Sequence, residues 1–482
     1  MTLGEAFRSH RPAMLWAMAI SLQGIMEGYN IALVGALVAA PAFQRRYGDY
    51  YDPELGYQVS FRWQMAFMLG AAAGGIVGGL LSGYMIEKIG ARITIMTAHV
   101  VLCGTIAITF CAPSIQVLFV GCLCNGLPWG ILAGVGPVYA SEVCPTAVRG
   151  YLINFVNFAW SCGGLLAAGV LQPFSTVMSQ WAYRIPFAIQ WIWPVPLFLI
   201  AFFAPSSPWW LIRRGRIEET RKSLRSLTRG LSDKEIDAKI ALMKHTDEYE
   251  KMAKTESSFA DCFKGTNLPR TEIAAVVLTS QAITGQVLAA SPTIGAGALG
   301  VAGNIFCWFL MAWFGRRRLF LFGLAGCGAS LMIVGILDSF GGRAIPFVQA
   351  ALCLVWMAIY SSIVAPGSYT IAGEISATRV RSQTMGFSRA VFGILSVTAG
   401  VVQTYITNPT GANISGKAAY VWFGGSTILF IWAFFRLPET KGRTYEELDI
   451  LFETGVTARK FRKQHIEVVA ENNHKIVDDA DP

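Results

Sequence analysis

Charged residues and histidines are scarce in this sequence. Asp, Glu, Lys and Arg together make up 14% of its 482 residues, whereas a soluble globular protein carries roughly 25%. The five histidines are scattered, and none of them has metal-site spacing or belongs to a recognisable nucleophile–base pair. The shortage of charge argues against a soluble domain, and the histidine pattern argues against an enzyme or a metal site.

The ten cysteines and the net charge of +9 also bear on the class of protein. Most cysteines fall inside apolar segments or at their ends, which is typical of free, buried thiols rather than disulfides. Lys and Arg cluster in 212–270 and at the ends of apolar segments, without interleaved aromatic residues. This placement favours the positive-inside pattern of a membrane protein over nucleic-acid binding.

Hydrophobic residues make up 54% of the chain and gather in long runs. About 20 apolar residues in a helix are enough to cross the ~30 Å hydrocarbon core of a bilayer. The runs predict twelve spans, at 13–36, 64–86, 93–111, 115–138, 150–172, 185–204, 272–291, 294–314, 319–337, 345–369, 385–406 and 418–436.

The distribution of Lys and Arg predicts the orientation of these spans. If the N-terminus lies inside, the inner loops hold most of the basic residues, and both termini lie in the cytosol. We expect four parts: an N-terminal six-helix half over 1–204, a cytosolic linker over 205–270, a C-terminal six-helix half over 271–443 and a cytosolic tail over 444–482.

One motif occurs twice, 232 residues apart. Glu142-Val-Cys-Pro-Thr-Ala-Val-Arg149 and Glu374-Ile-Ser-Ala-Thr-Arg-Val-Arg381 each lie where one apolar segment ends and the next begins. Likewise, Gly90-Ala-Arg92 follows the second span and Gly315-Arg-Arg317 follows the eighth. A membrane chain whose halves repeat is typical of a transporter with a central site between the halves.

Further segments point to one family by their order and spacing. They are Glu27-Gly-Tyr-Asn30, Pro41-Ala-Phe-Gln-Arg-Arg-Tyr-Gly48, Gly56-Tyr-Gln58, Arg62-Trp-Gln64, Tyr139-Ala-Ser-Glu-Val-Cys-Pro145, Pro205-Ser-Ser-Pro-Trp-Trp-Leu211 and Pro438-Glu-Thr-Lys-Gly-Arg443. On these segments the chain resembles the sugar porters of the major facilitator superfamily, and within them the fungal α-glucoside (maltose-type) permeases. The resemblance runs from about Ala6 to Phe452.

The resemblance implies an all-α membrane protein of twelve helices, whose two pseudo-symmetric halves rock about a midplane sugar site. It also implies an inner gate of two acid–base sets: Arg92, Glu142 and Arg149 in one half, and Arg317, Glu374 and Arg381 in the other. Ion pairs at such an interface are individually weak, so a gate can exchange them within a few kcal/mol. The alternative is static anchoring of the helix ends at the membrane surface.

Glu27 lies in the middle of the first predicted span, where a carboxylate costs roughly 2.5–3.5 kcal/mol or more. The resemblance implies a proton-linked role with Arg389 in span 11 as its partner. A structural hydrogen bond for Glu27, and an Arg389 that reaches the inner surface, are the alternatives. Asn30 and Gly75 stand where these permeases carry acids. We therefore expect proton coupling to be weakened or lost, and we expect no cofactor other than the proton as a coupling ion.

Sugar recognition requires amides, hydroxyls and an aromatic platform. The resemblance assigns this role to Asn157 in span 5, Gln281 in span 7 and Tyr369 in span 10, and Gln286 is a further amide close to Gln281. Each amide could instead form a hydrogen bond between helices.

The chain departs most from the family after Thr293. By the resemblance, family members carry roughly 15–20 more residues at this place than this chain does. We therefore expect helices 7 and 8 to be truncated at the outer side. An altered gene sequence would explain the same gap. Asn413 begins an N-glycosylation sequon in a predicted outer loop.

These observations predict a plasma-membrane sugar transporter for an α-glucoside or a hexose, acting as a monomer by alternating access. A transport-inactive relative, either a sensor or a degraded gene product, is the alternative that the missing segment favours.

Overall fold

The computed structural model describes residues 10–38, 40–52, 56–174, 177–253, 259–286, 294–340, 344–377, 380–407, 415–443, 445–461, 464–469 and 473–478. In this part of the chain the apolar runs form long helices. The first half contains α2 (Arg11–Ser21), α3 (Gln23–Leu37), α4 (Pro41–Tyr47), β1 (Tyr50–Asp52), β2 (Gly56–Gln58), α5 (Phe61–Ile89), α6 (Ala91–Phe110), α7 (Ile115–Val143), α8 (Thr146–Leu171), η1 (Gln172–Phe174), α9 (Trp181–Ile189), η2 (Gln190–Ile192) and α10 (Pro194–Phe203).

The remaining elements form a linker, a second half and a tail. The linker contains α11 (Pro208–Arg213), α12 (Ile217–Leu227), α13 (Asp233–Ala253) and η3 (Phe259–Phe263). The second half contains α14 (Asn267–Ile283), α15 (Ile294–Trp313), α16 (Arg316–Leu337), α17 (Ile345–Ile359), the π-helical turn η4 (Tyr360–Val364), α18 (Ala365–Ile375), α19 (Arg381–Thr407), η5 (Ser415–Ala418) and α20 (Ala419–Arg436). The tail contains α21 (Tyr445–Glu453), β3 (Gln464–Val469) and β4 (Asn473–Asp478).

Ten helices of the described part are long and apolar enough to cross a membrane, and the bent pair formed by Arg11–Leu37 and Pro41–Tyr47 would be an eleventh. The helix at the place of the predicted seventh span, α14, has 17 residues. Its length is about 26 Å at 1.5 Å per residue, which is short of a ~30 Å hydrocarbon core. The structure therefore confirms an all-α membrane bundle but not the count of twelve spans. Truncation after α14 stays a prediction, because residues 287–293 lie outside the described part.

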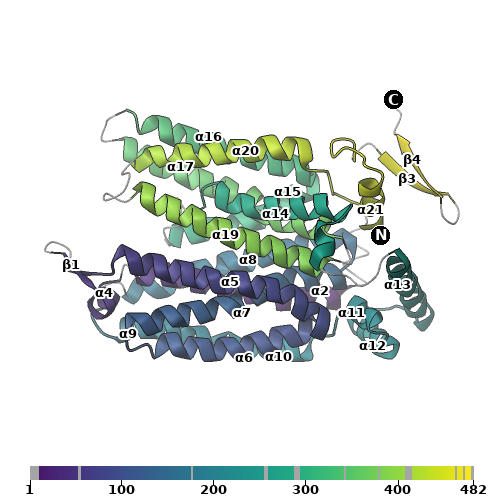
Figure 1. The fold of residues 1–482 in the computed structure, drawn as a ribbon, viewed down its shortest axis with the longest axis horizontal. Coiled ribbons are helices and arrows are strands. Elements are labelled where there is room, and N and C mark those ends of the chain that lie inside the picture. The colour runs from purple at the N-terminus through teal and green to yellow at the C-terminus, as the bar shows by residue number, and fades with distance from the viewer. Residues whose placement is uncertain are drawn as a thin grey trace.

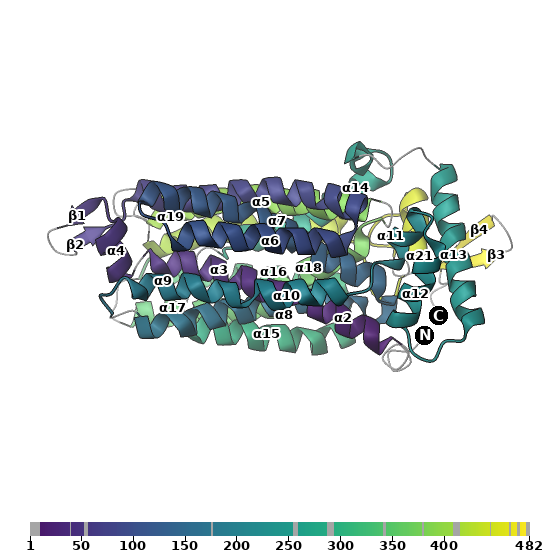
Figure 2. The same cartoon turned by 90° about the horizontal axis from the view of Figure 1, so that it is seen from below.

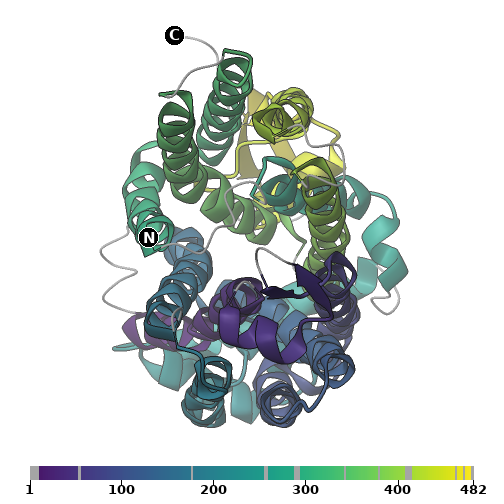
Figure 3. The same ribbon diagram turned by 90° about the vertical axis from the view of Figure 1, so that its left-hand side faces the viewer.

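The two halves pack side by side with their long helices roughly parallel (Figure 1). Viewed from one end, the first half and the second half form two separate groups of helices (Figure 3). Within the first half, α5 and α7 approach closely because their contact faces carry glycines. A Cβ at Gly126 would lie 2.9 Å from the Cα of Gly74, so only small residues fit this crossing.

The linker and α21 cluster at one end of the bundle, whereas α4 and the β1–β2 hairpin lie at the opposite end (Figure 2). We call the first the inner end and the second the outer end. At the inner end Arg270, at the start of α14, pairs with Asp449 of α21 and donates to the carbonyl oxygen of Ile375 at 2.7 Å. The tail helix is thus tied to the inner ends of α14 and α18.

Candidate transport site

An ion pair links the two halves of the protein. Arg389 of α19 donates from Nη2 to Oε1 of Glu27 in α3, and from Nη1 to the hydroxyl oxygen of Tyr369 in α18 at 2.5 Å. The side chain of Glu27 is 11% exposed and that of Arg389 is 14% exposed. The structure thus brings together the two residues that the sequence paired, and Arg389 does not extend to the inner surface. Their role in proton coupling stays a prediction.

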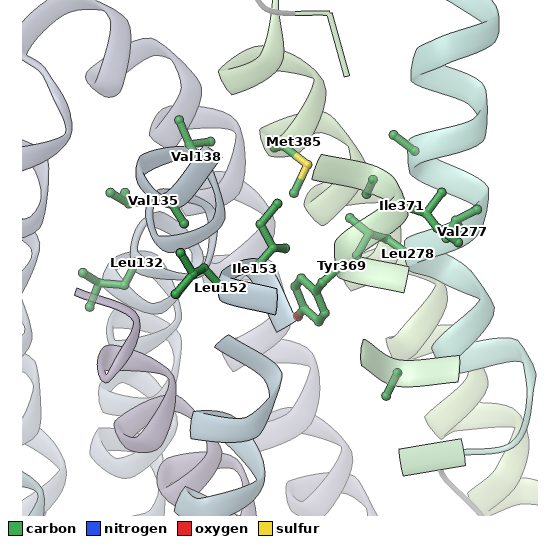
Figure 4. Packing of buried hydrophobic residues seen from close by; sticks show 14 of the residues in the cluster. Leu132, Val135, Val138, Leu152, Ile153, Val277, Leu278, Tyr369, Ile371 and Met385 are labelled. Atoms are coloured by element: carbon green, nitrogen blue, oxygen red, sulfur yellow. The ribbon is translucent and has the colours of Figure 1, made fainter. Parts of the chain in front are cut away.

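Tyr369 lies where α18 of the second half meets α8 of the first. Figure 4 shows its ring beside Ile153 of α8, within the large apolar core that both halves share. The helices approach closely here because residue 373 is a glycine, and a Cβ at Gly373 would lie 2.7 Å from Cδ1 of Ile153. Tyr369 is 8% exposed. The position combines an aromatic ring with a hydroxyl at the seam, as a sugar platform requires, but sugar binding by Tyr369 is untested.

Asn157 forms a second polar link between the halves. Its Nδ2 donates to Oδ1 of Asn304 in α15 at 2.7 Å. Asn304 in turn donates to Oγ of Ser161 at 3.0 Å and to the carbonyl oxygen of Gly300 at 2.9 Å. The contact is a hydrogen bond between helices, which was the alternative to sugar recognition for each predicted amide. The two roles are compatible, because the other polar atom of Asn157 is not used by Asn304.

The two predicted glutamines lie near the end of α14. Gln281 is buried in the last turns of that helix, and its Nε2 has no hydrogen-bond partner within the described part of the chain. Gln286 is half-buried in the turn that follows. A buried amide without a partner is uncommon in proteins and is available for a polar ligand or water. Gln281 therefore remains a candidate for sugar binding, and Gln286 is placed near it in the chain.

The predicted gate of the second half differs in one pairing. We expected Arg317 to meet Glu374, but Nη2 of Arg316 does so, at 3.3 Å. The second carboxylate oxygen of Glu374 accepts from the hydroxyl of Thr440 at 2.6 Å. The backbone nitrogen of Arg316 donates to Oε1 of Glu439 at 2.8 Å. The Pro438–Arg443 motif is thus joined to this cluster.

Arg317 is turned away from Glu374 because it holds the end of another helix. It donates to the carbonyl oxygen of Phe434 at 2.7 Å, and its guanidinium lies 5.8 Å from the centroid of that ring. Arg92 does the same in the first half, where it donates to the carbonyl oxygen of Phe202 and lies 5.5 Å from that ring. The duplicated Gly-x-Arg segments therefore form equivalent contacts, but with the ends of α10 and α20 rather than with a gate acid.

Contacts between the halves close the inner end. Nη1 of Arg381, which is 3% exposed, lies 3.3 Å from Oγ of Ser141 on α7. Two residues along, Nε2 of Gln383 donates to Oε2 of Glu87 on α5 at 2.6 Å. Glu142 has no hydrogen bond or ion pair with any side chain that the structure describes. The side chain of Arg149 and the sequon residue Asn413 lie outside the described part, so their roles stay predictions.

Three residues of this region were not predicted from the sequence: Arg316, Gln383 and Asn304. Arg316 stands in a run of three arginines, and nothing in the run indicates which one meets Glu374. Gln383 follows the gate motif but carries no charge. Asn304 is a polar residue inside an apolar span, and that alone could have identified it.

Both the structure and the sequence of this chain match those of known proteins. A solved structure of the proton:xylose symporter XylE bound to 6-bromo-6-deoxy-D-glucose superposes with a TM-score of 0.79 at 18% identity, covering 92% of this chain and 100% of that one. The inward open conformation of XylE from E. coli gives a TM-score of 0.69 at 19% identity, covering 90% and 98%. The fold is that of the major facilitator superfamily.

The sequence family described as "Sugar (and other) transporter" matches residues 16–452. The general alpha-glucoside permease of Saccharomyces cerevisiae is 33% identical over 484 residues, which cover 96% of this chain and 78% of the permease. Maltose permease MAL31 of the same species is 34% identical over 493 residues, which cover 98% and 80%. The chain belongs to the sugar transporter family of the major facilitator superfamily, and it is a multi-pass membrane transporter of sugars rather than an enzyme.

Proposed function

We propose that the protein carries α-glucosides such as maltose across the plasma membrane by alternating access, with proton coupling weakened or lost. The substrate class is supported by the relatives, which are named for α-glucosides and maltose and match along almost the whole chain. We also propose that both termini lie in the cytosol, that the protein works as a monomer and that it needs no cofactor. The density of Lys and Arg in the linker supports this orientation.

Alternating access is supported by where the halves touch. The contacts of Arg381 with Ser141 and of Gln383 with Glu87 tie the halves together at the inner end. Both are hydrogen bonds, which contribute only about 0.5–3 kcal/mol each. A rocking motion would break these two hydrogen bonds and open the inner end. The sugar would bind deeper in the bundle, at the polar contacts between the halves.

The weakened coupling is supported by the scarcity of acids inside the spans. Glu27 is the only acidic residue in the interior of a predicted span. Asn30 is buried one turn away, and an amide does not titrate. His99 is buried in α6, where its Nδ1 contacts the carbonyl oxygen of Ile95 in its own helix, and α6 packs against α5, α7 and α10 of the same half. A coupled transporter needs a group whose protonation changes between its two states, and Glu27 is the one acid in the interior of a predicted span that lies at the contact between the halves.

Uptake of labelled maltose and labelled glucose by cells that lack maltose transport of their own tests the proposal, with the external pH recorded during uptake. We expect saturable maltose uptake that exceeds glucose uptake, with little or no alkalinisation of the medium. A full proton signal would contradict the loss of coupling. Uptake of glucose without maltose would contradict the substrate class. No uptake by protein that has reached the membrane would favour the transport-inactive alternative.

A further inference from the structure

The contact between α8 and α15 crosses from one half to the other, and small residues make it close. A Cβ at Gly297 of α15 would lie 2.9 Å from the Cα of Leu165 on α8. One turn along, a Cβ at Gly300 would lie 3.6 Å from the Cβ of Ser161. The backbones therefore approach closely enough for short side chains to form hydrogen bonds across the seam.

Asn304 is fully buried at this contact, with 0% of its surface exposed. Its Oδ1 accepts from Asn157, and its Nδ2 donates to Ser161 and to the carbonyl oxygen of Gly300. The bond within α15 to Gly300 fixes the orientation of the Asn304 amide, because an amide turned over would place its oxygen against that carbonyl. The oxygen of Asn304 is thereby aimed at Asn157.

We propose that Asn304 is a positioning residue of the sugar site, which holds the side-chain amide of Asn157 in one orientation from the opposite half of the protein. This inference rests on the proposed function, because it takes Asn157 to be a sugar-binding residue. A side-chain amide presents donors on one side and an acceptor on the other. With its nitrogen bonded to Asn304, Asn157 has an oxygen that accepts no hydrogen bond from the described residues and can accept one from a sugar hydroxyl.

The neighbouring polar groups argue against a purely structural role for this seam. Asn154 lies one turn inward from Asn157 on α8 and is fully buried, yet neither of its amide atoms has a hydrogen-bond partner in the described part of the chain. Nε1 of Trp308, one turn inward from Asn304 on α15, also lacks one there. Static contacts between helices normally satisfy buried polar groups. Because these groups lie at the contact between the halves, beside the Asn157–Asn304 pair, they are available to a sugar hydroxyl or to water there.

Helical spacing places Asn154 on the same side of α8 as these contacts. Residues 154, 158, 161 and 165 recur at three- and four-residue intervals, which is one face of a helix. Ser161 and Leu165 on that face contact α15, and the ring of Phe158 lies 5.5 Å from that of Trp308. Asn154 therefore faces α15, inward of the amide pair.

Because Asn304 and Asn157 lie in opposite halves, sugar recognition depends on the contact between the halves. The orientation of Asn157 is fixed only while α8 and α15 stay in contact, so the sugar site is pre-organised by the approach of the two halves. Pre-organisation raises affinity by removing the entropy loss of ordering a side chain on binding. Without Asn304 we expect weaker sugar binding and an unchanged rate of rocking.

Kinetics of maltose uptake test the proposal on Asn304→Ala, Asn304→Asp, Asn157→Ala and the double variant Asn157→Ala/Asn304→Ala. We expect Asn304→Ala to raise KM about five- to tenfold with little change in the maximal rate per molecule, as the loss of one hydrogen bond predicts. The double variant should be no worse than Asn157→Ala. Asn304→Asp should restore most of the affinity, because a buried carboxyl stays neutral and keeps the shape and the accepting oxygen of Asn.

A matched control removes a buried amide elsewhere. Gln190→Leu alters a fully buried side chain in η2, whose amide atoms have no partner within the described residues, and its KM should be unchanged. A lower maximal rate at unchanged KM in Asn304→Ala, or effects of the two alanines that multiply in the double variant, would overturn the proposal. If Asn304→Ala does not reach the membrane, the KM of Asn304→Ser decides in the same way.

Wild-type uptake in the same cells separates this inference from the proposed function. If the wild type does not transport maltose, the proposed function fails. The role of Asn304 is then measured on the purified protein, as the concentration of maltose that gives half of the maximal rise in thermal stability. A five- to tenfold higher concentration for Asn304→Ala supports it, and equal concentrations, or no stabilisation of the wild type, overturn it.

Discussion

Arg389 and Glu27 stand 362 positions apart in the chain and form an ion pair across the two halves. Tyr369 shares the same guanidinium through its hydroxyl oxygen. The pair is nearly shielded from solvent, so each charge depends on the other for compensation. This makes the pair both a structural link between the halves and the remaining candidate for a proton-linked step.

Glu27→Gln should destabilise the protein strongly. Removing one partner of a buried pair leaves an uncompensated charge on Arg389 and costs about 3–5 kcal/mol. Thermal unfolding of the purified protein in detergent measures the effect. Arg389→Gln in the Glu27→Gln background should recover part of the lost stability, because no charge then remains. Two effects that simply add would contradict the pairing.

The choice of Arg316 over Arg317 as the partner of Glu374 can be tested by coupling. Glu374→Gln and Arg316→Ala should each lower the free energy of unfolding by about 1–3 kcal/mol, and their combination should cost clearly less than the sum. Arg317→Ala should show no such coupling with Glu374→Gln, because Arg317 binds the end of α20. Coupling with Arg317 instead would mean that the pairing predicted from the sequence is the correct one.

The inner end closes because α5 and α19 meet at glycines. A Cβ at Gly386 would lie 2.6 Å from the carbonyl oxygen of Gly79, a distance that forces the helices apart. Gly386→Leu should cost the closed inner end about 1–3 kcal/mol and lower the maximal rate of uptake about tenfold. Gly169→Leu is the control, since a Cβ there meets no atom within 4 Å. Equal rates for the two variants would show that this close approach is not needed.

Docking of the linker on the first span should depend on pH. Nε2 of His10 lies 3.3 Å from Nζ of Lys239 on α13, and burial together with the charge of Lys239 lowers the pKa of His10 from 6.5 to about 4. Between pH 4 and pH 6.5, the unfolded or undocked chain therefore binds more protons than the docked chain. The stability that this contact contributes is fully present above pH 6.5 and is lost as the pH falls toward 4.

Limited proteolysis of the linker at pH 7.5 and pH 5 measures this effect. Cleavage in 212–253 should be faster at the lower pH in the wild type. His10→Gln should reduce the difference between the two pH values, because its side chain does not titrate in this range. An unchanged difference in His10→Gln would assign the pH dependence to other groups.

Much of the fold followed from the sequence because each span is a long apolar run, and the length of such a run decides whether it crosses a membrane. The pairing of Glu27 with Arg389 was also accessible, since a buried charge requires a partner. The seventh span was overestimated: the apolar run extends to 291, but α14 ends at Ile283, followed by Gly285 at φ 93°. Composition alone does not reveal where a helix ends within an apolar run.

The gate contacts were harder to predict because several arginines compete for the same acids. Arg92 and Arg317 were assigned to gate acids by their repeated motif, but each binds a helix end through a carbonyl oxygen and an aromatic ring. A backbone carbonyl leaves no trace in the sequence. Asn304 is recognisable in the sequence as a polar residue inside an apolar span, but the identity of its partner depends on the contact between α8 and α15.

Transport by the purified protein in liposomes, with an inward proton gradient and labelled maltose outside, separates facilitated diffusion from proton symport. We expect maltose to enter until its concentration inside is equal to, or only slightly above, the concentration outside, with little or no effect of a protonophore on the rate or the final level. Accumulation of maltose to several times the external concentration, collapsing with the protonophore, would contradict weakened or lost coupling. The absence of any maltose entry into liposomes that contain the folded protein would contradict transport itself.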